Sequence, residues 1–201
     1  MKKRDRARLA EAIRFALDAH GEQTRKGRDI PYASHLLQVA GLVLEHGGDA
    51  ELAVAGVLHD VLEDCATVDR EMLRARFGEE VARIVESCTD LLPGDSPRAK
   101  GDWLERKQRY LARLHETDAR TRLVAACDKL QNLRSLVADL RAEGTDTLGR
   151  FRATPEQTRW YFETVRRTLC DDLPTRLVDE LDRLLAELSE FVPEIPGEPA
   201  D

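Results

Sequence analysis

The sequence predicts an all-α fold. Leu, Ala, Arg and Glu are abundant among the 201 residues, whereas aromatic residues make up only 5%, and this composition favours helices over strands. Along most of the chain, apolar residues recur at three- and four-residue steps, the periodicity of amphipathic helices. The length suits one domain with a sizeable core. We therefore expect a single domain over residues 1–192, followed by a disordered, proline-rich tail at 193–201.

Helix boundaries follow from capping and breaking residues. Expected helices run from Asp5 to about Gly21, from Ser34 to Gly47, from Asp49 through Asp64, from Thr67 or Asp69 over Phe77, from Gly78 over Val85, from Asp102 to about His115, from Asp118 to about Arg141, from about Pro155 to Leu169 and from Pro174 to Phe191. Ser34 and Asp49 are expected N-caps. Pro31 keeps the preceding residue out of the helical region, which places a loop before the second helix. Residues 91–102, with two prolines and two glycines, form an expected linker.

Charge and composition exclude several classes of partner. The formal net charge of −7 argues against broad binding to nucleic acid or to an anionic membrane. No apolar run reaches the length of about 18 residues needed for a membrane span, and the basic start leads into a helix pattern, not a signal peptide. The four cysteines form no closely spaced pair and are expected to be reduced thiols. We expect a cytoplasmic protein whose partner is a small molecule.

One stretch, residues 51–64, combines ionisable side chains with an apolar pattern that predicts burial. The pair His59-Asp60 and the pair Glu63-Asp64 interrupt an apolar helical run. At helical spacing, His59 and Glu63 share one face, and Asp60 and Asp64 share the neighbouring face. Burying so many ionisable groups is costly without a cation or tight pairing to neutralise them. The stretch therefore predicts a metal site.

Four side chains are predicted to hold the metal: His35, His59, Asp60 and Asp128. Each lies on an otherwise apolar helix surface, as an inward-facing ligand must. Two imidazoles and two carboxylates suit Mn²⁺, Fe²⁺ or another divalent ion, and the lack of thiolate ligands argues against structural zinc. Taken singly, each of these residues also fits a packed core histidine or a surface aspartate.

Glu63 and Asp64 are predicted to be catalytic. One helical turn beyond the His-Asp pair, they can hold and deprotonate a water whose pKa a cation has lowered. The alternative is a pair of solvated acids near a helix end, an unfavourable place for them because of the helix dipole.

A basic cluster is needed for an acidic chain to bind phosphates, and Arg25 and Lys26, just ahead of His35, provide one. Arg106 and Lys107 form a second candidate, for which a solvated surface pair is the alternative. Tyr161, within an aromatic triplet that also fits the core, can line a pocket.

Except for Arg106 and Lys107, these residues lie in four motifs, RKGRDIPYASHLLQVAGLVLEHGGDAELAVAGVLHDVLED, FGEEVARIVESCTDL, LVAACDKLQNLRSL and, more loosely, WYF. In this order the motifs resemble the HD hydrolase domain of the RelA/SpoT family, especially its small stand-alone members related to the metazoan SpoT homologue. The resemblance covers Leu9 to about Leu136. It implies an HD-domain helical bundle of about eight to ten helices.

The resemblance also implies an activity: Mn²⁺-dependent removal of the 3′-pyrophosphate from (p)ppGpp, giving GDP or GTP and pyrophosphate. It assigns the metal to the four residues proposed above and water activation to Glu63 and Asp64, and it adds Asn132 to the nucleotide contacts of Arg25 and Lys26. Two departures are Leu36 in place of the usual proline and Gln131 where relatives often carry His or Tyr, so that base contacts are expected to differ.

Other functions remain open at this point. The fold also suits a phosphohydrolase of another nucleotide, such as an adenosine alarmone, the 2′-phosphate of NADPH or a nucleoside monophosphate. A non-catalytic nucleotide sensor is a further alternative, although it would not need a water-activating acidic pair. The sequence leaves open the oligomeric state, the regulation and the identity of the metal in the cell.

Overall fold

The computed structural model describes residues 1–90, 102–169 and 172–193, and within these ranges it contains ten α-helices, one 3₁₀-helix and no named strand. The expected all-α class is confirmed. In chain order the elements are α1 (Lys3–His20), α2 (Ala33–Glu45), α3 (Ala50–Leu58), α4 (Val61–Asp64), α5 (Arg70–Phe77), α6 (Glu79–Cys88), α7 (Trp103–His115), α8 (Ala119–Glu143), η1 (Gly144–Arg150), α9 (Pro155–Leu169) and α10 (Thr175–Phe191).

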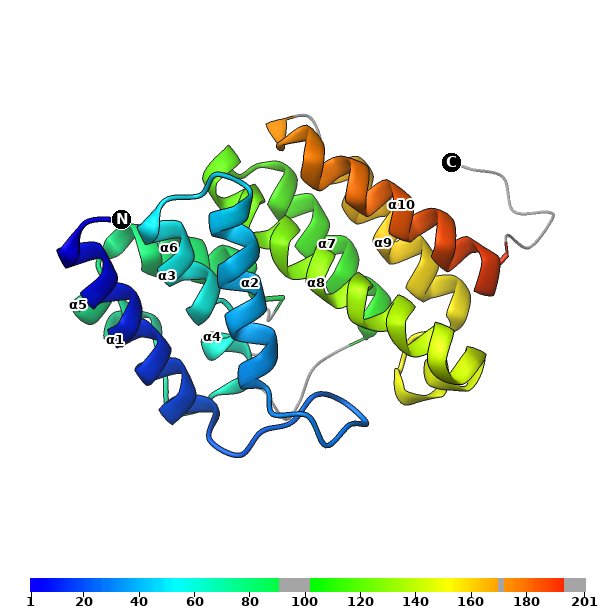
Figure 1. Ribbon diagram of the computed structural model, residues 1–201, viewed down its shortest axis with the longest axis horizontal. Helices are drawn as coiled ribbons and strands as arrows, with labels where there is room; N and C mark the ends of the chain where they lie inside the picture. The colour runs from blue at the N-terminus through cyan, green and yellow to red at the C-terminus, as the bar shows by residue number, and fades with distance from the viewer. Residues whose placement is uncertain (91–101, 170–171, 194–201) are drawn as a thin grey trace.

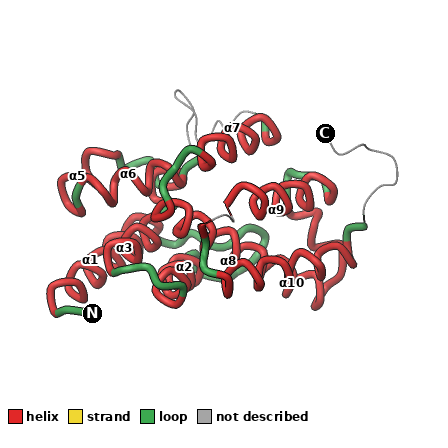
Figure 2. The backbone as a smooth tube through the Cα atoms, turned by 90° about the horizontal axis from the view of Figure 1, so that it is seen from above, coloured by secondary structure: helices red, strands yellow, loops and turns green. Residues whose placement is uncertain are grey.

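The long helix α8 joins two groups of helices (Figure 1). On one side lie α1 to α6, with α2 and α3 packed against each other and both packed against α8. On the other side, α9 and α10 pack against each other and against α8, and α7 packs against α9. In the view of Figure 2, α5, α6 and α7 run along one edge, and α1, α2, α8 and α10 lie toward the other. This arrangement places the middle of α8 between the two groups.

Aspartates cap four of the helices where the sequence predicts a helix start. The side chains of Asp49, Asp69, Asp102 and Asp118 each accept a hydrogen bond from the backbone N–H three residues on, at 2.8–2.9 Å. Such caps satisfy amide groups that have no partner inside the helix. The prediction for Ser34 is wrong, because α2 begins at Ala33 with Tyr32 at the N-cap position and no side-chain cap.

The expected continuous helix from Asp49 through Asp64 is also wrong. Helix α3 ends at Leu58, and the separate single turn α4 begins at Val61. Asp60 lies between them at φ −100° and ψ −5°, in the sparsely populated bridge region where many active-site residues are found. The proposed ligands His59 and Asp60 thus occupy a helix break, although the apolar pattern of the sequence runs through it.

Several predictions fall partly outside the described residues. The expected linker at 91–102 lies outside them except for Asp102, the expected tail at 193–201 lies outside except for Pro193, and Cys170 also lies outside. The three described cysteines, Cys65, Cys88 and Cys127, are buried free thiols. Within the described part of the chain, every helix is too short or too polar to cross a membrane.

Candidate metal centre

Three helical regions bring the four predicted ligands together. His35 lies in the first turn of α2, His59 and Asp60 lie in the break after α3, and Asp128 lies in the first half of α8. Because α2, α3 and α8 pack against one another, their inward side chains meet. His35 and His59 are each 1% exposed, and Asp128 is 3% exposed. The Asp60 side chain is 15% exposed, and the four residues together form a largely buried cluster, called the metal cluster below.

Distances within the metal cluster are short. The Nε2 atoms of His35 and His59 are 3.1 Å apart. Asp60 Oδ2 lies 3.3 Å from the first of these atoms and 3.0 Å from the second, and Asp128 Oδ1 lies 3.3 and 3.5 Å from them. Adjacent ligand atoms that each lie about 2.1 Å from one ion are separated by roughly 3.0–3.5 Å for octahedral to tetrahedral angles. The observed separations therefore fit ligands of a single ion.

The outer nitrogens of both histidines are held by acceptors. His59 Nδ1 is 2.8 Å from the carbonyl oxygen of Gly56, so Nδ1 must carry the proton. His35 Nδ1 donates to Oε1 of Gln131, whose own Nε2 donates to Ser135 Oγ at 2.8 Å and so fixes the amide orientation. In each neutral ring, Nε2 then presents a lone pair to the cluster, the tautomer that metal-binding histidines adopt.

The metal cluster needs positive charge at its centre. Two lone pairs and two carboxylates face one another, and the Lys129 ammonium on Asp128 offsets only one of the negative charges, so the remaining repulsion calls for a shared cation or proton. Burial by itself would lower the pKa of His59, but the carboxylates of Asp60 and Asp128 outweigh it and hold the pKa well above its ordinary value. The donor set therefore fits a divalent metal ion, which competes with protons for the same atoms.

Further polar side chains orient the two carboxylates. Tyr32 donates its hydroxyl hydrogen to Asp60 Oδ2 at 2.5 Å. Asn132 Nδ2 donates to Asp128 Oδ1 at 2.6 Å, while the buried ammonium of Lys129 pairs with Asp128 Oδ2. Ligand carboxylates in metal sites are commonly held by such outer contacts.

The predicted catalytic pair lies next to the metal cluster. Glu63 and Asp64 form the end of the single turn α4, which follows Asp60 directly, and both are partly buried. Glu63 Oε2 accepts a hydrogen bond from the backbone N–H of Asp90 at 3.2 Å, and the carbonyl of Asp64 accepts one from Gln23 Nε2 at 3.2 Å. The Glu63 carboxylate and the Asp64 backbone are thus each held by a residue outside α4.

Two of the predicted substrate residues contact the metal cluster or its neighbours. Arg25 Nη2 donates to Asn132 Oδ1 at 2.7 Å, and Asn132 in turn donates to Asp128. The guanidinium of Arg25 also lies 5.7 Å from the ring centre of Tyr32. Lys26 points elsewhere along the same loop, with its ammonium 5.4 Å from the ring centre of Phe151.

Arg106 and Lys107 are not a solvated surface pair. Arg106 Nη1 lies 2.5 Å from Asp90 Oδ1, and Lys107 Nζ lies 2.6 Å from Asp90 Oδ2. The Asp90 and Arg106 side chains are only 3% and 8% exposed, so this triad, called the Asp90 cluster below, is buried. Lys107 also lies 5.1 Å from the ring centre of Tyr161, whose buried hydroxyl has no hydrogen-bond partner among the described residues.

Sequence reasoning missed four residues of this region: Tyr32, Asp90, Lys129 and Gln131. Gln131 was expected to affect base contacts, but it is 2% exposed and supports His35 instead. Its position three residues after Asp128, on an apolar helix face, was a usable signal. Asp90 and Tyr32 act through contacts 16 to 28 residues away, which no local pattern indicates.

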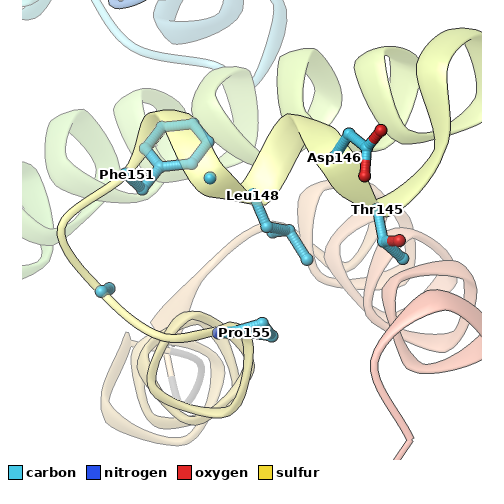
Figure 3. A pocket seen from close by; sticks show the side chains of 7 residues that line it. Thr145, Asp146, Leu148, Phe151 and Pro155 are labelled. Atoms are coloured by element: carbon cyan, nitrogen blue, oxygen red, sulfur yellow. The ribbon is translucent and has the colours of Figure 1, made fainter.

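A separate shallow cavity of about 480 Å³ lies along η1 and the start of α9 (Figure 3). Its lining residues are mostly apolar or small: Thr145, Asp146, Leu148, Gly149, Phe151, Ala153 and Pro155. No predicted site residue lines it, although Lys26 reaches Phe151 at its rim. The chemistry described above therefore lies outside this cavity.

Fold and site together define a class: an all-helical protein with a buried His/Asp cluster of metal-ligand type at the junction of three helices. Residues 12–154 match the HD domain family. The chain belongs to this family, and membership implies a divalent metal at such a cluster.

Relatives of known name point in one direction. The chain is 37% identical over 130 residues to a probable guanosine-3′,5′-bis(diphosphate) 3′-pyrophosphohydrolase of Synechocystis, and 37% identical over 135 residues to the corresponding enzyme MESH1 of Xenopus tropicalis. These alignments cover 65% and 66% of the chain, and 17% and 71% of the respective relatives. The chain thus spans under a fifth of the bacterial relative.

Solved structures agree with the sequence matches. A metazoan ortholog of SpoT, which hydrolyses ppGpp and plays a role in starvation responses, superposes with a TM-score of 0.71 at 26% identity, covering 90% of this chain and 95% of the other. A Listeria monocytogenes protein, lmo0812, gives a TM-score of 0.67 at 28% identity, covering 78% and 99%. The expected likeness to RelA/SpoT-type hydrolases and the expected HD-domain bundle are confirmed.

Proposed function

We propose that the protein is a metal-dependent hydrolase that removes the 3′-pyrophosphate from (p)ppGpp, leaving GDP or GTP and pyrophosphate. The observation that carries this proposal is the metal cluster, to which Asn132 and Arg25 are hydrogen bonded in series. A pyrophosphate ester presents several anionic oxygens at once. A buried divalent ion with a guanidinium two hydrogen bonds away is suited to such a group.

The four ligands would be His35, His59, Asp60 and Asp128, and we propose Mn²⁺ as the ion because imidazole and carboxylate donors suit it. When bound, a divalent ion supplies Lewis-acid polarisation of a phosphoryl oxygen and lowers the pKa of water. Gln131 and Gly56 hold the two imidazoles in the ligand tautomer. Tyr32 keeps the Asp60 carboxylate turned toward the cluster.

Glu63 and Asp64 are proposed to position the attacking water and to accept its proton. The water oxygen forms a bond to the phosphorus nearest the ribose, and the bond from that phosphorus to the 3′ oxygen breaks. A proton then has to reach the 3′ oxygen, and a carboxylate that has taken the proton from water can return it. The hydrogen bond from the Asp90 N–H to Glu63 limits the rotation of the Glu63 side chain, so that its carboxylate stays in place.

Positive side chains are proposed to receive the nucleotide. Arg25 and Lys26 supply charge from the loop before α2, and Lys107, with the Tyr161 hydroxyl nearby, supplies it from α7 and α9. A buried hydroxyl that finds no partner among the described residues is costly, and a phosphate oxygen would satisfy it. Arg106 holds Asp90 and so supports Lys107. The partner is thus a small nucleotide, in keeping with an acidic chain and a cytoplasmic setting.

A substrate panel tests the proposal. The protein is stripped of metal with a chelator, reloaded with Mn²⁺ and incubated with ppGpp, pppGpp, an adenosine alarmone, NADPH and a nucleoside monophosphate. We expect pyrophosphate to be released from the guanosine 3′-pyrophosphates only, and only after reloading. Release of orthophosphate alone would refute the alarmone activity. Binding of ppGpp without turnover would identify a sensor.

A further inference from the structure

The loop that carries Arg25 and Lys26 is folded as a tight unit. An antiparallel bridge links Thr24 to Pro31, and the N–H of Arg25 donates to the carbonyl of Ile30 at 2.8 Å. Gly27 has a φ of +68°, a conformation that other residues rarely adopt. The turn that results places Arg28 at the tip of the loop. Residues 24–31 are called the substrate loop below.

Arg28 enters a group of four charges, which we call the loop anchor. Its Nη2 atom lies 2.5 Å from Asp139 Oδ1, and its Nη1 atom lies 2.5 Å from Glu143 Oε1. Arg150 pairs with the same two carboxylates, most closely with Glu143. The four side chains are 26–35% exposed, so solvent screens the group only in part.

The loop anchor and the metal cluster lie on one face of α8. Asp128, Asn132, Asp139 and Glu143 follow one another at steps of four, seven and four residues, and such steps repeat on the same side of a helix. The substrate loop contacts this face at two places, through Arg25 on Asn132 and through Arg28 on Asp139 and Glu143. Seven residues of helix, about 10 Å, separate the two contacts.

Steric contact reinforces the ionic one. A Cβ atom added to Gly27 would lie 2.8 Å from Cδ of Arg150, which shows that the loop backbone rests directly on that side chain. Next along the chain from Arg150, the ring of Phe151 receives the ammonium of Lys26. Both neighbours of Gly27 in the substrate loop are thus tied to the same corner formed by α8 and η1.

We propose that Arg28, Asp139, Glu143 and Arg150 are positioning residues for substrate binding. By fixing the tip of the substrate loop, they hold Arg25 and Lys26 in the orientation that receives the anionic nucleotide. None of the four contacts the metal cluster. Loss of the anchor therefore weakens binding of the nucleotide, while metal affinity and the chemical step are retained. This inference rests on the proposed function for the identity of what Arg25 and Lys26 bind.

The test uses the double variant D139N/E143Q in the full chain. Hydrogen–deuterium exchange of a peptide covering residues 22–31 is expected to rise, because the loop tip loses both carboxylates. KM for ppGpp is expected to increase by about five- to tenfold, with kcat within twofold and the Kd for Mn²⁺ unchanged. The conservative variant D139E retains the charge, so that most of the binding is restored when it replaces D139N in the double variant.

D182N is the matched control. It removes a carboxylate that pairs with Arg166 through two bonds of 2.5 and 2.8 Å between α9 and α10, away from the substrate loop. Unchanged exchange and KM in D139N/E143Q, or equal changes in D182N, would overturn the inference. If the parent protein fails to hydrolyse ppGpp, the proposed function fails, but the exchange comparison still decides whether the anchor holds the loop.

Discussion

Two buried charged clusters of the molecule balance their charges in opposite ways. In the Asp90 cluster, one carboxylate faces two cations, Arg106 and Lys107, at 2.5 and 2.6 Å. In the metal cluster, two carboxylates face two imidazoles whose outer nitrogens are already hydrogen bonded. In the first cluster the chain itself supplies two positive charges to one carboxylate. In the second cluster Lys129 pairs with the Asp128 carboxylate, whereas Asp60 faces two imidazoles and a hydroxyl, so a cation from outside the chain is needed to complete the cluster.

Matched Asp-to-Asn substitutions sharpen the contrast. D60N removes one charged ligand from the metal cluster but keeps an oxygen that can accept the Tyr32 hydrogen bond. We expect ppGpp turnover to fall by about 1000-fold together with loss of Mn²⁺ binding. Unfolding of the metal-free protein by urea is expected to change less than in D90N, because His59, whose pKa the Asp60 carboxylate raises, can give up its proton when that charge is removed. Retained turnover in D60N would contradict the assignment of Asp60.

D90N, in contrast, is expected to lower the stability of the fold. It leaves the buried charges of Arg106 and Lys107 without their carboxylate, and breaking such a group costs about 3–5 kcal/mol. We expect that loss in the free energy of unfolding measured with urea, whether or not Mn²⁺ is present. If D90N is as stable as the parent protein, the Asp90 cluster does not contribute to the fold as described.

Gln131 gives a smaller effect on the metal cluster. Replacing it with Leu removes the acceptor that holds His35 Nδ1 and lets the ring change tautomer. Outer-contact residues of metal sites typically contribute about 10–100-fold in affinity, so the Kd for Mn²⁺ in Q131L is expected to rise by that range. The measurement is a calorimetric titration, with S135A as a milder control that disturbs only the far side of the Gln131 amide.

Acid pH is expected to weaken the Asp90 cluster. Burial would raise the pKa of Asp90, but Lys107 and Arg106 outweigh it, and the pKa lies below its ordinary value of 3.8. The stabilisation from this carboxylate is therefore complete above the unfolded-state value and is lost as pH falls through the lower folded-state value. Unfolding curves of the parent and D90N should differ at pH 6, begin to converge below about pH 4 and coincide only below the folded-state pKa of Asp90. A constant difference would exclude this linkage.

Much of the fold was predictable because helices are local. The cap residues Asp49, Asp69, Asp102 and Asp118 lie where the sequence indicates, and apolar periodicity marks the helices that follow them. The break at His59-Asp60 was not predictable, since apolar residues continue on both sides of this pair from Val54 to Leu62 and no proline or glycine marks the break itself. The 3₁₀-helix η1 carries no comparable signal in its polar sequence.

The candidate site also has a part that the sequence predicts and a part that it does not. Convergence of His35, His59, Asp60 and Asp128 followed from motifs, and the structure brings these side chains together; their role as ligands stays a prediction, as do the roles of Glu63 and Asp64. The solvated-surface alternative for Arg106 and Lys107 is excluded, because both pair with Asp90, which follows α6 and lies 16 residues before Arg106. Packing between distant segments decides such long-range pairs, and the sequence of one segment does not indicate them.

The most direct measurement is a titration of metal-free protein with Mn²⁺, followed by electron paramagnetic resonance or calorimetry, for the parent, H59A and D90N. We predict one tight Mn²⁺ per chain in the parent and in folded D90N, and none in H59A. A parent protein that fails to bind the ion, or an H59A variant that binds it equally well, would contradict the claim that this cluster is completed by a cation from outside the chain.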